Sequence, residues 1–175
     1  MRPLIVEVPS PLGLRPSGVE RAPAALRAAG LHARLGCDDA QHVAVPAYDD
    51  RRDTATGVLN PGGIAEVAFS LAGVIESALQ AGRLPVVLGG DCSIVLGPLL
   101  ALRRRGRYGL GYLDGHADFQ HPADEPNGEV ASLDLALATG RGVAELVLEK
   151  GLLPAERLAG LLRPEVVAGS GQVPA

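Results

Sequence analysis

Three residues that can bind a metal ion occupy every second position of a short stretch, LDGHAD, at 113–118. They are Asp114, His116 and Asp118, and an apolar run, YGLGYL, leads into them. In a β-strand, residues i, i+2 and i+4 project on the same side, so an extended backbone would bring these side chains together. Two carboxylates and an imidazole suit Mn²⁺, Zn²⁺ or Fe²⁺ better than Ca²⁺ or Mg²⁺, which prefer oxygen ligands. The spacing therefore predicts a metal site, with a solvated polar loop as the simpler alternative.

A second group of polar residues follows another apolar run, LPVVLGG, at 84–90. Asp91 and Cys92 come directly after this run. Strands that are apolar on both faces are typical of parallel sheets covered by helices. Ligands of such sheets bind beyond the carboxyl ends of the strands. Both polar groups are expected at that edge, which favours a binding site over a solvated loop.

The elements that must position these residues alternate along the chain. A helix is expected over 63–81, because Ile64, Val67, Leu71 and Ile75 recur at the three-and-four spacing of one apolar helix face. Other helices are predicted at 22–30 and 93–106 and after 132, and strands at 3–8, 42–48, 84–90 and 108–114. Strand and helix in alternation indicate an α/β domain with a parallel sheet.

Composition narrows the class of protein further. The chain has 175 residues, of which 47% are hydrophobic and 21% charged, typical of one globular domain. A formal net charge of -4 gives no reason to expect nucleic acid or an anionic membrane as a partner. No unbroken apolar run approaches a membrane span, the N-terminus lacks a signal-peptide pattern, and two cysteines are too few for a disulfide framework. These features predict a cytoplasmic protein.

Together the motifs resemble those of the ureohydrolases, the family that includes arginase, agmatinase and formiminoglutamase. LGGDCS at 88–93 resembles the family's G-G-D-H-S, and LDGHAD at 113–118 resembles its D-A-H-x-D. GVERAPAALRAAGL at 18–31 resembles an N-terminal segment, G-V-x-x-x-P-x-A-L-R. The resemblance implies an arginase- and deacetylase-like three-layer α/β/α sandwich with a mainly parallel sheet. It also implies a metal-dependent hydrolase of C–N bonds in linear amidines or guanidino compounds.

The resemblance further implies a binuclear manganese site. Asp114 would bridge the two ions, Asp118 would hold the first and His116 the second, and a shared hydroxide would attack the amidino carbon of a small substrate. Cys92 stands where the family has a histidine ligand, and a thiolate favours Zn²⁺ or Fe²⁺ over Mn²⁺. Cys92 is therefore either a fourth ligand or a small buried loop residue. Homo-oligomer formation is left open.

The sequence departs from the family pattern in two other places. The family's proton-transferring histidine, in a loop that reads roughly N-x-H-G, has no counterpart in PNGEVASLDLALATG at 126–140; His121 is nearest and does not align. No catalytic residue is therefore assigned. The downstream S-F-D-x-D ligand motif is also absent. The expectation is a single partial domain over 1–175, C-terminally incomplete, whose residues 168–175 form a disordered or out-of-frame tail.

Three other interpretations stay open. The chain could be a non-catalytic or inactive truncated family member that lacks the downstream ligands. It could hold one Zn²⁺ through Asp114 and His116, which resemble the Asp-x-His pair of the deacetylases with this fold, although the later aspartate of that site is missing from the sequence. It could also be a cysteine hydrolase with Cys92 as nucleophile, His116 as base and an aspartate orienting the base.

Overall fold

Three parallel strands form the centre of the protein in a computed structural model that describes residues 1–37, 39–120, 125–140 and 156. Strand β1 (Arg2–Val8) lies between β2 (Ala40–His42) and β3 (Arg83–Gly89). β1 and β3 are paired along their whole length, from Arg2 opposite Arg83 to Val8 opposite Gly89. Because the two strands end level, the loops that follow them leave the sheet side by side.

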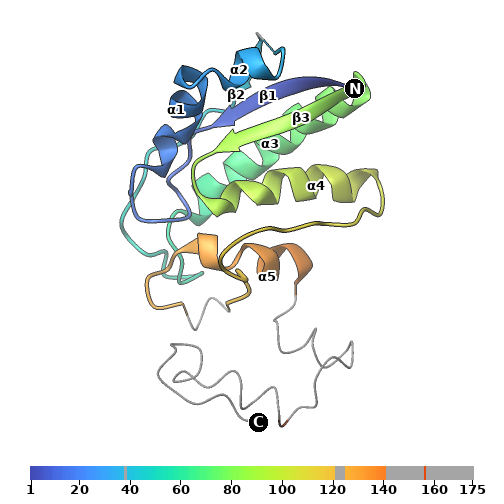
Figure 1. The fold of residues 1–175 in the computed structure, drawn as a ribbon. Coiled ribbons are helices and arrows are strands. Elements are labelled where there is room, and N and C mark those ends of the chain that lie inside the picture. Colours follow the sequence, from blue (N-terminus) through green and yellow to red (C-terminus); the bar gives the residue numbers. More distant parts are fainter. Residues whose placement is uncertain (38, 121–124, 141–155, 157–175) are drawn as a thin grey trace.

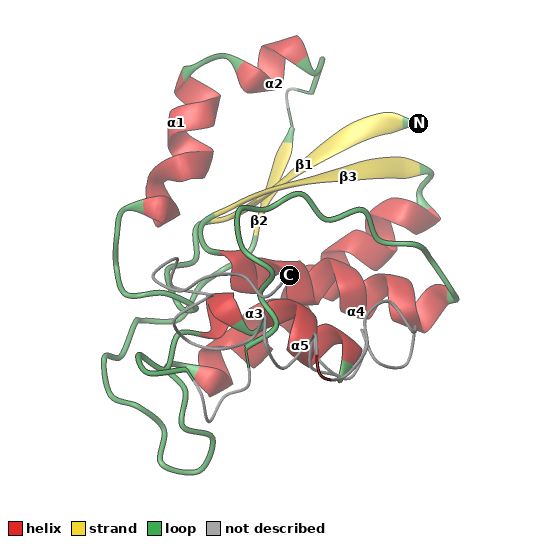
Figure 2. Ribbon diagram, turned by 60° about the horizontal axis from the view of Figure 1, so that its bottom comes forward, coloured by secondary structure: helices red, strands yellow, loops and turns green. Residues whose placement is uncertain are grey.

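Helices cover both faces of this sheet, as Figures 1 and 2 show. One face carries η1 (Val19–Arg21), α1 (Ala22–Ala28) and α2 (Leu31–Arg34). The other carries α3 (Pro61–Gln80) and α4 (Leu96–Arg105), which follows the 3-10 turn η2 (Cys92–Val95). Farther along, η3 (Val130–Ser132) leads into α5 (Asp134–Thr139), beside α4. The predicted α/β/α layering is confirmed.

Alternation along β1 divides the core into two parts. Leu4, Val6 and Val8 face α3 and α4 and belong to the larger hydrophobic cluster, whereas Ile5 faces the other way and packs with Cys37 and Leu88. The apolar stripe of α3 is buried against the sheet, as its spacing predicts. The length and composition of α3 would allow it to span a membrane. A buried apolar stripe such as that of α3 is also a feature of a helix in the core of a globular domain.

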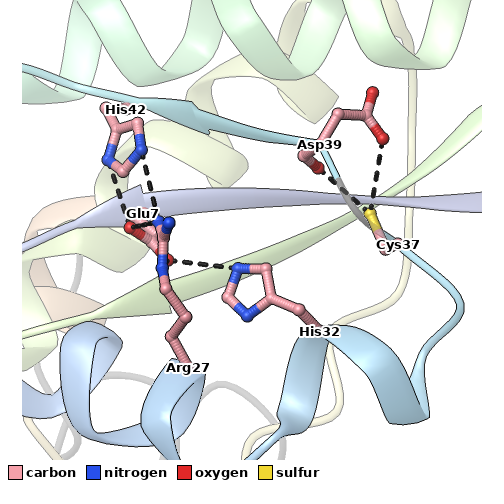
Figure 3. A network of polar contacts seen from close by, with 6 residues as sticks. All are labelled: Glu7, Arg27, His32, Cys37, Asp39 and His42. Atoms are coloured by element: carbon pink, nitrogen blue, oxygen red, sulfur yellow. Dashed lines mark hydrogen bonds and ion pairs between the residues drawn. The ribbon is translucent and has the colours of Figure 1, made fainter.

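The face of the sheet under α1 and α2 also carries a buried carboxylate, Glu7 (Figure 3). Arg27 of α1 donates to both of its oxygens, from Nε at 3.1 Å and from Nη2 at 2.6 Å. His32 Nε2 lies 3.2 Å from Glu7 Oε1, and His42 Nδ1 lies 3.1 Å from Oε2. In the same layer the Cys37 thiol donates to the carbonyl oxygen of Asp39 at 3.2 Å. Glu7 thus connects α1, α2 and β2 to the central strand.

Two of the expected strands differ from the structure. β2 is shorter and earlier than the predicted 42–48, and the predicted strand at 108–114 lies in a segment without regular secondary structure. A strand needs a neighbour to take its backbone hydrogen bonds, and within the described residues none pairs with 108–114. Its apolar side chains Tyr108, Leu110 and Leu113 are accordingly exposed.

The close approach of α3 and α4 generates a stability prediction. A Cβ at Gly97 would lie 2.8 Å from side-chain atoms of the fully buried Leu71, so Gly97→Ala is expected to destabilise the protein by about 1–3 kcal/mol through overpacking. Urea unfolding of the purified protein would measure this free energy.

Gly73 provides the matched control, because it lies in the middle of α3, is exposed and would have no atom within 4 Å of an added Cβ. Gly73→Ala should raise stability by about 0.5–1 kcal/mol, the usual gain from replacing a mid-helix glycine. Equal effects of the two substitutions would contradict the packing argument.

Candidate metal centre

The candidate site begins where β1 and β3 end. The Gly90 N–H donates to the Val8 carbonyl at 3.2 Å, and the Asp91 N–H donates to the Ser10 carbonyl at 2.9 Å. A Cβ at Gly90 would collide with the Ser10 backbone, so only glycine permits this approach. The loop after β3 is therefore held directly against the loop after β1.

Asp91 strengthens this junction with its side chain. Its carboxylate is buried and accepts from Ser10 Oγ at 3.1 Å, Gly13 N at 3.1 Å and Ser93 N at 2.9 Å. The last bond caps η2, which starts with Cys92. Asp91 thus acts as the anchor that presents Cys92, a role that the sequence alone did not reveal.

Three of the predicted ligands meet at this edge. Ligand atoms of Cys92, Asp114 and Asp118 all lie within 4.8 Å of one another, and Cys92 Sγ is 3.9 Å from Asp114 Oδ2. Asp118 is buried, whereas Cys92 and the side chain of Asp114 are only partly covered. A thiol and two carboxylates at such separations form a donor set that suits a divalent transition metal. We call these three residues the ligand cluster.

His116 lies outside the ligand cluster. Its side chain is 87% exposed, its Nδ1 is 3.6 Å from Asp114 Oδ1, and its backbone N–H donates to that same oxygen at 3.0 Å. The expectation of an extended backbone over this stretch is wrong, because residues 115 and 116 form a bend and Asp118 has a φ of 49°, in the left-handed region. Whether His116 binds metal stays a prediction.

The backbone of Asp118 is held by α5. Its carbonyl oxygen accepts from the backbone N–H groups of Leu135 at 3.0 Å and Ala136 at 3.3 Å, at the start of that helix. On the side chain, Asp118 Oδ2 accepts from the Tyr112 hydroxyl at 2.5 Å. Burial, reinforced by Asp118, raises the pKa of Tyr112, so the phenol stays a hydrogen-bond donor. Both contacts hold the Asp118 carboxylate in the ligand cluster.

A further carboxyl group, that of Asp134, lies beside the ligand cluster. Asp134 is 0% exposed, and among the described residues neither of its oxygens has a hydrogen-bond partner. Burial, followed by the charges of Asp91, Asp118 and Asp114, raises its pKa to about 8. An unpartnered buried carboxyl in such surroundings is costly unless a cation balances it, so these residues fit a metal centre. No spacing rule singled out Asp134, which stands within a predicted helix.

The same acidic surroundings act on Cys92. Burial, followed by Asp118, Asp134, Asp114 and Asp91, raises the pKa of its thiol to about 11. Nucleophilic cysteines need a lowered pKa, so this environment counts against the cysteine-hydrolase interpretation. A bound cation would favour the thiolate instead.

The loop that follows the ligand cluster is fastened to earlier parts of the chain. Glu125 is buried, and its Oε2 accepts from Glu129 N at 2.8 Å. Arg52 Nη2 donates to the Glu125 carbonyl at 2.7 Å, and Glu129 Oε1 accepts from Arg15 N at 3.0 Å. His121 and the predicted tail at 168–175 lie outside the described residues.

Fold and site together define an α/β protein with metal-binding side chains beyond the carboxyl ends of parallel strands. Comparison with known proteins makes the class more specific, because the Arginase family model matches residues 3–159. The chain therefore belongs to the arginase family.

Individual relatives agree with this assignment. An arginase of Staphylococcus aureus (strain MRSA252) is 32% identical over 82% of this chain and 50% of its own length. The Bacillus caldovelox arginase is 31% identical over 88% of this chain and 54% of its own. Its native structure superposes with a TM-score of 0.72 at 29% identity, covering 95% of this chain and 55% of that one. An Entamoeba histolytica arginase in complex with L-ornithine gives a TM-score of 0.68 at 25% identity, covering 83% and 52%. The chain thus spans about half the length of these relatives.

The anchoring role of Asp91 leads to a second prediction. Asp91→Ala leaves the N–H groups of Gly13 and Ser93 without their acceptor in a buried site, so we expect a loss of about 3 kcal/mol or more in unfolding free energy. Asp53→Ala is the control, because Asp53 also accepts three hydrogen bonds, from Ala55 N, Thr56 N and Thr56 Oγ1, but at the solvent-accessible surface. A loss at Asp53 as large as that at Asp91 would contradict the role of burial.

The raised pKa of Cys92 predicts slow alkylation at neutral pH. Only the thiolate reacts, so labelling of metal-free protein by iodoacetamide should accelerate roughly tenfold per pH unit and level off near pH 11. Peptide mapping by mass spectrometry separates Cys92 from the buried Cys37. The same protein unfolded in urea supplies the reference rate. If Cys92 in the folded protein is labelled at pH 7 as fast as in urea, the cysteine-hydrolase interpretation regains support.

Proposed function

We propose that this chain forms part of a metal-dependent hydrolase that cleaves a C–N bond in a guanidino or linear amidino compound. The observation that carries the proposal is the convergence of Cys92, Asp114 and Asp118 within 4.8 Å in a chain of the arginase family. Because the chain spans about half of its relatives, the activity is proposed for the polypeptide that contains it.

Each residue of the ligand cluster has a distinct task in this proposal. Cys92, Asp114 and Asp118 would hold the metal, which when bound activates water and polarises the substrate. Asp91 keeps Cys92 at the edge of the sheet, and the Tyr112 hydroxyl orients the Asp118 carboxylate. We propose Mn²⁺ as the cation from the family resemblance, with Zn²⁺ or Fe²⁺ as alternatives that the Cys92 thiol favours.

The comparison with relatives supports an amino-acid-like substrate. The Entamoeba histolytica relative was crystallised with L-ornithine, an amino acid with a cationic side chain. We therefore propose a small guanidino or amidino compound that resembles an amino acid as the substrate. A cytoplasmic location remains a prediction from the sequence.

The inactive alternative is not favoured, because the family match extends over residues 3–159 and three predicted ligands meet. Its test is hydrolysis by the full-length polypeptide, measured as urea or ammonia release from arginine, agmatine and formiminoglutamate with Mn²⁺, Zn²⁺ or Fe²⁺. Asp114→Asn should lower kcat/KM by on the order of 100-fold or more, because it removes a carboxylate ligand. Asp53→Asn, far from the ligand cluster in sequence and accessible to solvent, should leave kcat/KM unchanged. Wild-type protein that releases neither product with any of the cations would contradict the proposal.

A further inference from the structure

We infer that Asp134 is an additional ligand of the metal centre, a buried carboxylate supplied by the first residue of α5. The inference rests on the proposed function, since it concerns the same cation. It adds a ligand that the family motifs do not supply, at a position where no ligand spacing is present in the sequence.

Asp134 lacks a partner where comparable buried groups have one. Glu7 is buried against Arg27, and Asp91 accepts three hydrogen bonds. Asp118 accepts from Tyr112. Asp134 is fully buried, and no described residue donates to either of its oxygens. Buried polar groups are rarely left in this state, and an ion is one of the few things that satisfies a carboxylate completely.

The position of Asp134 ties it to the ligand cluster. The next two residues, Leu135 and Ala136, donate their backbone N–H groups to the carbonyl oxygen of Asp118. α5 also contacts η2, the turn that begins with Cys92. Asp134 is therefore held through its chain neighbours to Asp118, and its helix packs against the turn that carries Cys92. The charges of Asp118 and Asp114 both act on its carboxyl, and its charge acts on the Cys92 thiol, which agrees with this proximity.

An ordinary helix-start role does not account for Asp134. An acidic residue in the first turn of a helix normally accepts from a backbone N–H there or faces solvent. Asp134 does neither in the described part of the chain. The residues around it instead add further negative charge, which disfavours a carboxylate unless a cation is present.

The experiment compares metal binding and metal-free stability in the full-length polypeptide. Asp134→Asn keeps the shape of the side chain and removes its charge. We expect the affinity for Mn²⁺ and Zn²⁺, measured by calorimetry and by metal content after dialysis, to fall at least tenfold. The metal-free variant should melt at or above the temperature of metal-free wild type, because a buried unpaired carboxyl has been removed. Asp53→Asn is the control, and it should change neither quantity.

The outcomes separate the two proposals. If Asp134→Asn lowers the metal-free melting temperature and binds metal within twofold of wild type, Asp134 has a structural role and the inference is overturned while the proposed function stands. If wild type itself binds neither cation, both proposals are overturned. Should Asp134→Asn fail to fold by circular dichroism, Asp134→Glu decides, because it keeps the charge and displaces it by one methylene. A changed metal affinity in that variant supports the inference, and an unchanged one overturns it.

Discussion

The buried carboxylate of Asp91 is the interaction on which the arrangement of the site depends. β1 and β3 end level with each other, and backbone hydrogen bonds join the loops that leave them. The Asp91 side chain reinforces this connection by accepting from Ser10 and Gly13 on one loop and from Ser93 on the other. The short approach of the two loops at Gly90 is possible because glycine has no Cβ. The position of Cys92, and hence the shape of the ligand cluster, follows from one anchored turn.

The ligand cluster shows how a fold can maintain a locally unfavourable charge arrangement. Several acids and a thiol are held together by contacts outside the cluster: α5 binds the Asp118 backbone, Tyr112 binds its side chain, and η2 carries Cys92. The packing free energy of the two-sided core maintains this arrangement. A cation would convert the repulsion into attraction, so binding and folding are expected to be thermodynamically coupled here.

Sequence patterns predicted the structural features that depend on residues close together in the chain. The apolar stripe over 63–81 became α3, because burial on the sheet is encoded in its side chains. The segment 108–114 is equally apolar, but a strand also needs a paired neighbour, which its own sequence does not supply. Residue type, order and the family resemblance marked Cys92, Asp114 and Asp118 as candidates, and the structure brings their ligand atoms within 4.8 Å of one another; that they bind metal stays a prediction. The exposed position of His116 was not predictable, because the segment does not stay extended: residues 115 and 116 form a bend, and Asp118 has a left-handed backbone. The burial of Asp134 arises from packing between distant segments, which its local sequence does not encode.

The unequal division of the core has a consequence for the motions of the molecule. The layer of α3 and α4 rests on the large hydrophobic cluster, while the layer of α1 and α2 rests on the small one around Ile5 and on the ionic contacts of Glu7. Such a layer can detach while the rest of the protein stays folded. In hydrogen-exchange terms, α1 and α2 are expected to form a separate cooperative unit whose amides become exposed by partial opening, well before those of β1, β3 and α3.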